Sequence, residues 1–177
     1  MKIRIYKGTP RGSVTPPPSK SIAHRLLIVA SMCEGVSTVR RVPDCEDVLA
    51  TLDCLTALGA KIEIQGSKIK CGGLNPFSAK ETTIYCRESG STLRFMIPLA
   101  FLSGSKITLT GSERLFARNL TIYEEIAKQN GIIFEKGKSS LTVCGTLKSG
   151  SYKIAGNISS QFISGMLFAL PLLDIVS

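Results

Sequence analysis

A short serine-rich pattern recurs in this chain at a fixed interval, and each copy precedes an apolar stretch. The copies are Ser19-Lys20-Ser21, Ser89-Gly90-Ser91 and Ser159-Ser160-Gln161, and their first serines are spaced 70 residues apart. Serine is a favoured N-cap, so each copy is predicted to begin a helix. Such a repeat indicates similar units whose helix starts meet on one face if they pack around a common axis. The alternative is a chance similarity of serine caps.

The first copy follows three prolines, Pro16-Pro17-Pro18, which hold the backbone extended before the helix begins. The free N–H groups at a helix start attract anions. Lys20 lies at that start, and Arg25 lies about one turn further along. Together with Arg94 after the second copy, these residues would form a cationic face. The simpler interpretation is an ordinary capped helix with two solvated cations.

Basic residues are concentrated near the N-terminus. The net charge is +9, and residues 1–41 hold eight of the 22 basic residues beside one acidic residue. These basic residues form no run of five or more, and no aromatic residue interleaves with them, which disfavours nucleic acid as a partner. The charge instead favours an anionic small molecule such as a phosphorylated metabolite.

The cysteines indicate neither a zinc site nor a disulfide framework. The six are scattered, none forms a Cys-x-x-Cys pair, and His24 is the single histidine. Scattered thiols fit a reducing cytoplasm, where we expect the protein to be located with its cysteines reduced. The sequence contains no apolar run of about 18 residues and no signal-peptide core, so it predicts neither a transmembrane helix nor export.

Apolar periodicity and turn residues divide the chain into a repeating order of strand, helix, strand, helix, strand, strand. The helices are expected over residues 21–33, 45–58, 91–102, 120–130 and from 160 onward. The strands are expected over residues 3–6, 36–42, 61–64, 68–71, 82–86, 106–110, 132–135, 140–144 and 151–154. Asp44 and Asn119 are the expected N-caps of two helices, which end at Gly59 and Gly131.

Mixed helices and strands of these lengths predict an α/β fold. Residues 95–102 and 163–173 are apolar on almost every side, which is typical of core helices. We therefore expect helices gathered in the centre and sheets outside. The third unit stops after its first helix, so we expect the chain to be a fragment of a longer protein.

Four motifs, taken in order, resemble those of the enolpyruvylshikimate-phosphate synthase family. They are Pro17-Pro18-Ser19-Lys20-Ser21 with Arg25, Ser89-Gly90-Ser91-Thr92-Leu93-Arg94, Glu113-Arg114 with Arg118, and Gly156-Asn157-Ile158-Ser159-Ser160-Gln161-Phe162. The resemblance extends through nearly the whole chain. It implies two domains, each an inside-out α/β barrel of three βαβαββ units with buried helices and outer sheets.

The resemblance also implies a domain division. Residues 19–177 would form most of one domain, with units over about 19–80 and 81–150 and an incomplete unit over 151–177. Residues 1–18 would be a strand and hinge that belong with the missing second domain. The whole enzyme is expected to be a monomer.

The reaction that the resemblance implies is transfer of the enolpyruvyl group of phosphoenolpyruvate to the 5-hydroxyl of shikimate 3-phosphate, with release of phosphate. This step belongs to chorismate and aromatic amino-acid biosynthesis and requires neither a metal nor an organic cofactor. The residues implied to bind shikimate 3-phosphate are Lys20, Ser21, Arg25, Ser159, Ser160 and Gln161. Those implied to bind phosphoenolpyruvate are Lys20, Gly90, Arg118 and Gln161.

The sequence departs from the family pattern in two respects. Glu88-Ser89-Gly90-Ser91 and Arg94-Phe95 stand where some members have Asn-Ala-Gly-Thr and Arg-Pro, which bears on inhibitor sensitivity. The family's acid and base carboxylates belong to the missing half, so no catalytic residue is assigned here and the fragment alone is expected to be inactive. Glu88, Glu113 and Asp174 are expected to be solvated or structural.

Two other functions stay open. The sister enzyme that transfers enolpyruvate to a UDP-sugar shares the fold and the donor, although Ser159-Ser160-Gln161 and Pro18-Ser19-Lys20-Ser21 favour the shikimate enzyme. A non-catalytic anion-binding module would use the same basic helix starts. In each case the expected partners are small phosphorylated molecules rather than nucleic acid or a membrane.

Overall fold

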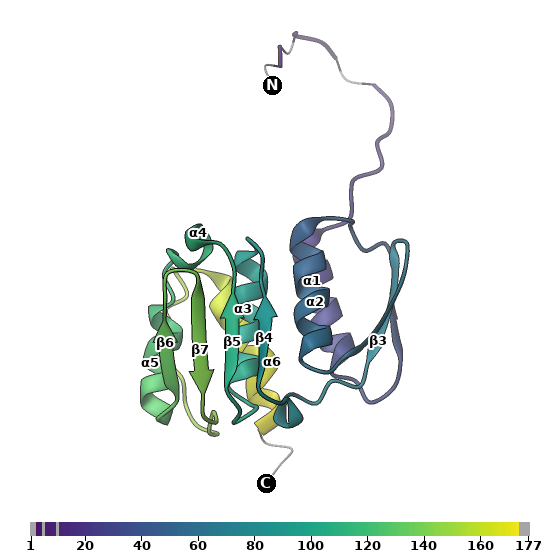
Figure 1. The fold of residues 1–177 in the computed structure, drawn as a ribbon. Coiled ribbons are helices and arrows are strands. Elements are labelled where there is room, and N and C mark those ends of the chain that lie inside the picture. Colours follow the sequence, from purple (N-terminus) through teal and green to yellow (C-terminus); the bar gives the residue numbers. More distant parts are fainter. Residues whose placement is uncertain (1–2, 5, 10, 174–177) are drawn as a thin grey trace.

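Two open sheets and the helices that pack against them make up the protein (Figure 1). The structure is a computed structural model that describes residues 3–4, 6–9 and 11–173. Its helices are α1 (Lys20–Ser31), α2 (Glu46–Ala57), η1 (Pro76–Ser78), α3 (Gly90–Ala100), α4 (Glu113–Phe116), α5 (Thr121–Asn130) and α6 (Ser160–Leu173). Its strands are β1 (Ser37–Val39), β2 (Lys61–Gln65), β3 (Lys68–Gly72), β4 (Thr82–Tyr85), β5 (Ile107–Thr110), β6 (Ile133–Lys136) and β7 (Ser140–Cys144).

The two sheets repeat one strand arrangement. The first sheet has the order β1-β3-β2, with antiparallel pairing that places Ser37 and Ile62 opposite Cys71. The second has the order β4-β5-β7-β6, in which β4 runs parallel to β5 and the other pairs are antiparallel. Strands β5, β7 and β6 thus stand in the same order as β1, β3 and β2, which is consistent with two copies of one repeated unit.

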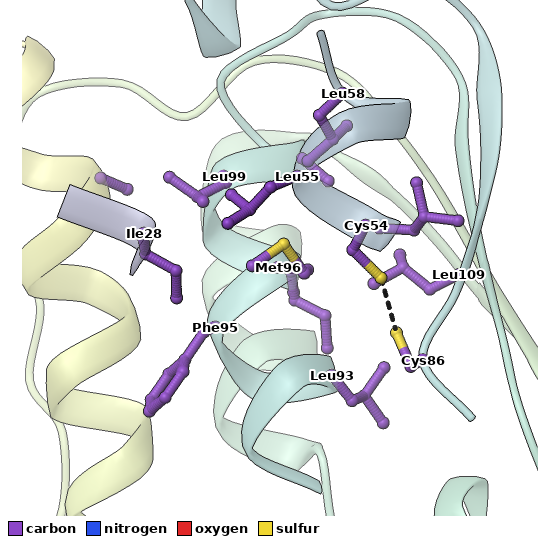
Figure 2. Close-up of a cluster of buried hydrophobic side chains, with 14 of the residues drawn as sticks. Ile28, Cys54, Leu55, Leu58, Cys86, Leu93, Phe95, Met96, Leu99 and Leu109 are labelled. Carbon is purple, nitrogen blue, oxygen red and sulfur yellow. Dashed lines mark hydrogen bonds between the residues drawn. The ribbon is translucent and has the colours of Figure 1, made fainter. Parts of the chain in front are cut away.

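Helices occupy the space between and behind the sheets. Helices α1 and α2 pack on the first sheet, and α2 also contacts β4 and α3 (Figure 1). Helices α3 and α6 pack tightly against each other. The side chains between α1, α2, α3 and β4 form one apolar core, which includes Ile28, Leu55, Met96 and the thiols of Cys54 and Cys86 (Figure 2). The predicted α/β class with inner helices is confirmed.

The three predicted helix starts are confirmed, and each is capped by the expected serine. Ser19 Oγ accepts a hydrogen bond from the backbone N–H of Ile22 at 3.4 Å, and Ser89 Oγ accepts one from Thr92 at 3.2 Å. Ser159 Oγ accepts a bond from the N–H of Gln161 at 3.3 Å. These bonds satisfy backbone donors that have no partner inside the helix.

Two predicted strands are wrong. Residues 3, 4 and 6 and residues 151–154 form no regular structure, and residue 5 lies outside the described residues. A strand needs a neighbour to satisfy its backbone hydrogen bonds, and the N-terminal segment extends away from both sheets (Figure 1). Alternation of side chains was therefore insufficient to predict pairing.

Helix ends were predicted with mixed success. Asp44 is not an N-cap, because α2 begins two residues later, at Glu46. Two acidic side chains in the first turn of α2 interact favourably with the helix dipole. Leu120 rather than Asn119 precedes α5, although Asn119 Oδ1 accepts a bond from the N–H of Thr121 at 2.8 Å. The glycine ends are confirmed, since Gly59 and Gly131 have φ angles of 109° and 70°.

The two strongly apolar helices differ in burial. Helix α3 is buried along almost its whole length, as predicted. Helix α6 buries Phe162, Gly165, Met166 and Ala169, but the side chain of Leu167 is 61% exposed. The prediction of a fully buried helix is wrong for α6, because within the described residues its packing comes mainly from α3 on one side.

No helix among the described residues is long and apolar enough to cross a membrane. Likewise, the part of the chain that the structure describes contains no group of three His, Cys, Asp or Glu side chains placed to hold a metal ion. All six cysteines are free thiols.

Candidate functional site

The starts of α1, α3 and α6 meet, and Arg25 lies at their junction. From α1, its Nε and Nη2 atoms donate to Ser164 Oγ on α6 at 3.3 and 3.0 Å. Its Nη1 donates to the Ser21 carbonyl at 2.8 Å. The guanidinium carbon lies 5.2 Å from the ring centroid of Phe95 on α3, within the range of a cation–π contact. Arg25 is thus held by contacts with three helices.

Gln161 joins the start of α6 to the start of α3. Its Oε1 accepts a bond from Arg94 Nη1 at 2.6 Å, and its Nε2 donates to Ser91 Oγ at 2.7 Å. The Arg94 guanidinium carbon also lies 5.0 Å from the ring centroid of Phe162. The amide of Gln161 therefore ties the first turns of both helices together.

A second cationic group lies beside Arg94. The Arg118 guanidinium occupies the space where a Cβ on Gly90 would be, and Arg94 Nη1 lies 3.6 Å from the same position. Burial, and secondarily the charge of Arg118, lowers the pKa of Arg94. Its Nε atom is buried without a hydrogen-bond partner among the described residues. Two guanidinium groups gathered at a helix N-terminus are suited to bind an anion.

The backbone carbonyl of Arg94 accepts its hydrogen bond from a side chain instead of from the helix backbone. Pro98 lies four residues later in α3 and has no N–H, so it cannot make the helical bond to the Arg94 carbonyl. Tyr123 Oη on α5 donates to that carbonyl instead, at 2.6 Å. Burial raises the pKa of Tyr123, which keeps the hydroxyl protonated and able to donate. Gly165 leaves the space that this hydroxyl needs on α6.

Lys20 is turned toward α2 rather than toward the junction. Its ammonium forms an ion pair with the Asp47 carboxylate, and this hydrogen bond raises the pKa of Lys20. In contrast, Arg25, Arg94 and Arg118 form no ion pair with any described residue. These three cations therefore remain available for an external anion.

The structure brings together only some of the substrate-binding residues that the resemblance implies. Arg25, Gly90, Arg118 and Gln161 lie at the meeting helix starts, through the contacts given above. Ser159 caps α6, Ser160 is exposed in its first turn, and Ser21 contributes its carbonyl to Arg25.

Sequence reasoning missed four residues of the site as partners. They are Asp47, Ser91, Arg94 and Ser164. Arg94 was expected on the cationic face but had no assigned role. Ser164 follows Ser160 by four residues and so lies one turn along the same helix face, which is a signal that could have identified it.

The acidic residues considered earlier lie apart from these contacts. Glu88 and Glu113 are exposed, and Asp174 lies outside the described residues. No role is assigned to them by the geometry.

Solved structures of enolpyruvyl transferases share this α/β arrangement with inner helices, which assigns the chain to their fold class. The EPSP synthase structure from Acinetobacter baumannii aligns with a TM-score of 0.75 and 26% identity, covering 89% of this chain and 38% of that one. The enolpyruvyl transferase NikO from Streptomyces tendae aligns with a TM-score of 0.53 and 12% identity, covering 85% and 35%, which concerns the fold alone.

The sequence comparison narrows the class to one family. Residues 7–174 match the family EPSP synthase (3-phosphoshikimate 1-carboxyvinyltransferase), and the chain belongs to that family.

Among curated relatives, the 3-phosphoshikimate 1-carboxyvinyltransferase of Clostridium kluyveri is 46% identical over 165 residues, covering 92% of this chain and 39% of the relative. That of Clostridium perfringens (strain SM101 / Type A) is 42% identical over 175 residues, covering 97% and 41%. The chain thus spans about two fifths of the length of these relatives.

Proposed function

We propose that this chain supplies the shikimate 3-phosphate half of an active site that transfers the enolpyruvyl group of phosphoenolpyruvate to the 5-hydroxyl of that substrate, with release of phosphate. The observation that carries the proposal is the meeting of Arg25, Arg94 and Arg118 at helix starts, without an ion-pair partner among the described residues. Membership in the EPSP synthase family supports the choice of substrates over a UDP-sugar.

In this proposal the α1 and α6 starts bind shikimate 3-phosphate. Arg25 presents two nitrogen donors, now directed at Ser164 Oγ, that fit the paired oxygens of the substrate carboxylate. Ser159 and Ser160, with the free N–H groups of α6, bind the 3-phosphate. Ser21 and Gln161 contact the remainder of the substrate.

The α3 start binds phosphoenolpyruvate in the same proposal. The missing side chain of Gly90 allows Arg118 to lie against the helix, where it and Arg94 face the anion. Gln161 contacts both substrates, and Lys20 lies between them. Lys20 reaches them by exchanging its contact with Asp47 for the substrate phosphate or carboxylate.

We further propose the domain division implied by the family. Residues 1–18 would form a strand and hinge, and residues 19–177 would form units over about 19–80, 81–150 and 151–177. The acid and base carboxylates would come from a second half, in a cytoplasmic, cofactor-free and monomeric enzyme. The chain by itself would then release no phosphate from the two substrates, and steady release in a coupled assay would contradict this division.

Binding of shikimate 3-phosphate to the 177-residue chain tests the proposal directly. Charge-assisted hydrogen bonds contribute about 1.5–3 kcal/mol each, whereas association costs at least several kcal/mol. We expect a Kd of about 0.1–1 mM, with phosphoenolpyruvate binding more weakly, measured by NMR titration.

The matched variants are Arg25→Lys and Arg40→Lys. Arg25→Lys should weaken binding, because an ammonium cannot make the paired contact with a carboxylate. Arg40 is exposed just after β1 and makes none of the contacts described above, so its substitution should have no effect. If the two substitutions had equal effects, or if inorganic phosphate and shikimate 3-phosphate bound with equal affinity, the proposal would be wrong. The site would then be a basic patch without specificity for shikimate 3-phosphate.

A further inference from the structure

A chain of four buried polar side chains runs beneath the site and crosses three helices. His24 Nδ1 on α1 lies 2.7 Å from Thr51 Oγ1 on α2, which lies 2.8 Å from Thr92 Oγ1 on α3. Thr92 Oγ1 donates to Ser89 Oγ, the cap of α3, at 2.7 Å. His24, Thr51 and Thr92 are 0% exposed and Ser89 is 1% exposed. We call these four residues the buried relay.

Each hydroxyl in the buried relay has one proton to donate, which sets the order of donors and acceptors along it. We assign the one hydroxyl proton of Thr92 to its shorter bond, toward Ser89 Oγ at 2.7 Å, so that Thr92 accepts from Thr51. Thr51 has then used its own proton, so it must accept from His24 Nδ1–H. The Asp47 carbonyl is a less favourable acceptor, since it lies 3.4 Å from the Thr51 hydroxyl and 3.2 Å from that of Thr92.

The far side of the imidazole agrees with this direction. His24 Nε2 is buried and has no hydrogen-bond partner among the described residues. In the Nδ1–H tautomer Nε2 is an unpaired acceptor rather than an unpaired N–H donor, and buried N–H groups without a partner are the rarer case. Phe95 packs edge-on near this ring, with centroids 6.4 Å apart, and offers no acceptor oxygen.

The two ends of the buried relay adjoin the site. His24 precedes Arg25, and Ser89 precedes Gly90 and Ser91. The Ser89 oxygen receives both the Thr92 hydroxyl and the Thr92 N–H, the second at 3.2 Å. Ser89, which caps the first turn of α3, is therefore held in place by the Thr92 hydroxyl. The Thr92 hydroxyl is in turn bonded to Thr51.

We propose that Thr51 and Thr92 are positioning residues, and that the buried relay holds His24 as its Nδ1–H tautomer and fixes the first turn of α3 relative to α1. Thr51 on α2 binds no substrate in this proposal. Its hydrogen bonds to His24 and Thr92 set the distance between Arg25 on α1 and Gly90 on α3. The part of this inference that concerns substrate affinity rests on the proposed function. The tautomer and the order of the α3 cap do not.

The decisive variants are Thr51→Val, which removes the hydroxyl and keeps the branched shape, and Thr51→Ser, which keeps the hydroxyl. Thr56→Val is the matched control, because Thr56 lies on the exposed face of the same helix and its hydroxyl donates to the Leu52 carbonyl at 2.9 Å. All three are made in the full 177-residue chain. The probes are imidazole ¹⁵N shifts of His24 and amide hydrogen exchange.

We expect ¹⁵N shifts of an Nδ1–H imidazole in the parent chain. In Thr51→Val, exchange at the Thr92 amide should rise about tenfold relative to that at Met96 in the same helix, the equivalent of one hydrogen bond. Thr51→Ser and Thr56→Val should leave this ratio within about twofold. An Nε2–H tautomer, or equal acceleration at Thr92 and Met96 in Thr51→Val, would overturn the buried relay as a positioning device.

Substrate affinity provides a separate outcome. Thr51→Val should raise the Kd for shikimate 3-phosphate several-fold, and Thr51→Ser should restore it. If the parent chain binds no shikimate 3-phosphate, the proposed function fails, and the buried relay is then judged by the tautomer and the exchange ratio alone. If the parent binds and Thr51→Val binds equally well, the positioning role is wrong.

Discussion

The guanidinium of Arg118 lies in the space that a side chain on Gly90 would need. Gly90 is the first residue of α3, and Arg118 follows the short helix α4 in the sequence. The absence of a Cβ thus brings a cation from a distant segment to the N-terminus of a buried helix, beside Arg94. This relationship makes the anion site depend on a glycine.

Replacing Gly90 with alanine should therefore weaken anion binding without unfolding the protein. We expect the Kd for phosphoenolpyruvate to rise about tenfold, comparable with the loss of one charge-assisted hydrogen bond. The free energy of unfolding should change by less than about 1 kcal/mol, since alanine favours a helix more than glycine does. NMR titration and urea unfolding measure the two quantities.

Gly35→Ala is the control for this prediction, because a Cβ there meets no atom within 4 Å. It should leave the Kd unchanged. Unaltered binding in Gly90→Ala would show that the position of Arg118 does not matter.

The contact of Tyr123 with Arg94 predicts a coupling between two distant substitutions. Tyr123→Phe removes the hydroxyl that donates to the Arg94 carbonyl, which should lower the free energy of unfolding by about 1–3 kcal/mol. In a Pro98→Ala background the helix can supply the missing N–H, so the same substitution should cost at least about 1 kcal/mol less. A double-mutant cycle by urea unfolding measures the coupling, and strictly additive effects would contradict this explanation.

His24 should make the protein less stable in mild acid. Burial lowers the pKa of His24 to about 4 in the folded protein, from about 6.5 when unfolded. Between these values the unfolded chain binds the additional proton, so the free energy of unfolding decreases as the pH falls from about 6.5 to 4. The full shift corresponds to roughly 3 kcal/mol.

His24→Asn removes the single histidine and provides the comparison. The carboxylates titrate in both proteins, so the difference between their stability curves isolates His24. Urea unfolding between pH 7 and pH 4 should give a shallower decrease for His24→Asn, and parallel curves would contradict a buried neutral imidazole.

The cysteines should differ sharply in reactivity with an aromatic disulfide reagent. Cys33 is exposed, whereas Cys54, Cys71 and Cys86 are buried. The hydrogen bond with Cys86, together with burial, raises the pKa of Cys54, and burial raises that of Cys71. Both effects disfavour the reactive thiolate. The three buried thiols should react only as fast as the protein opens, which absorbance of the released thiolate measures.

Cys33→Ser should remove the fastest phase of this reaction, and Cys71→Ser should retain it. Rapid labelling of Cys54 or Cys86 in the folded chain, identified by peptide mapping, would show that the core opens more readily than its packing indicates.

Much of the local structure could be predicted because it depends on neighbours in the sequence. The caps Ser19, Ser89 and Ser159 bond N–H groups two or three residues away, so the pattern of residues was sufficient to predict where three helices begin. Alternating strands and apolar helices likewise predicted the α/β class. The strand predictions for residues 3, 4 and 6 and for residues 151–154 were wrong, because a strand requires a partner that its own sequence does not supply.

The sequence alone thus determined the helix starts, the order of elements over residues 82–144 and the cationic character of the site. Only the tertiary structure decided which groups meet there. Lys20 is paired with Asp47 on α2, and Gln161 lies between Arg94 and Ser91, which are 67 and 70 residues away from it. The 70-residue interval predicted that the helix starts meet, whereas the pairing of particular side chains depends on how α1, α2, α3 and α6 pack.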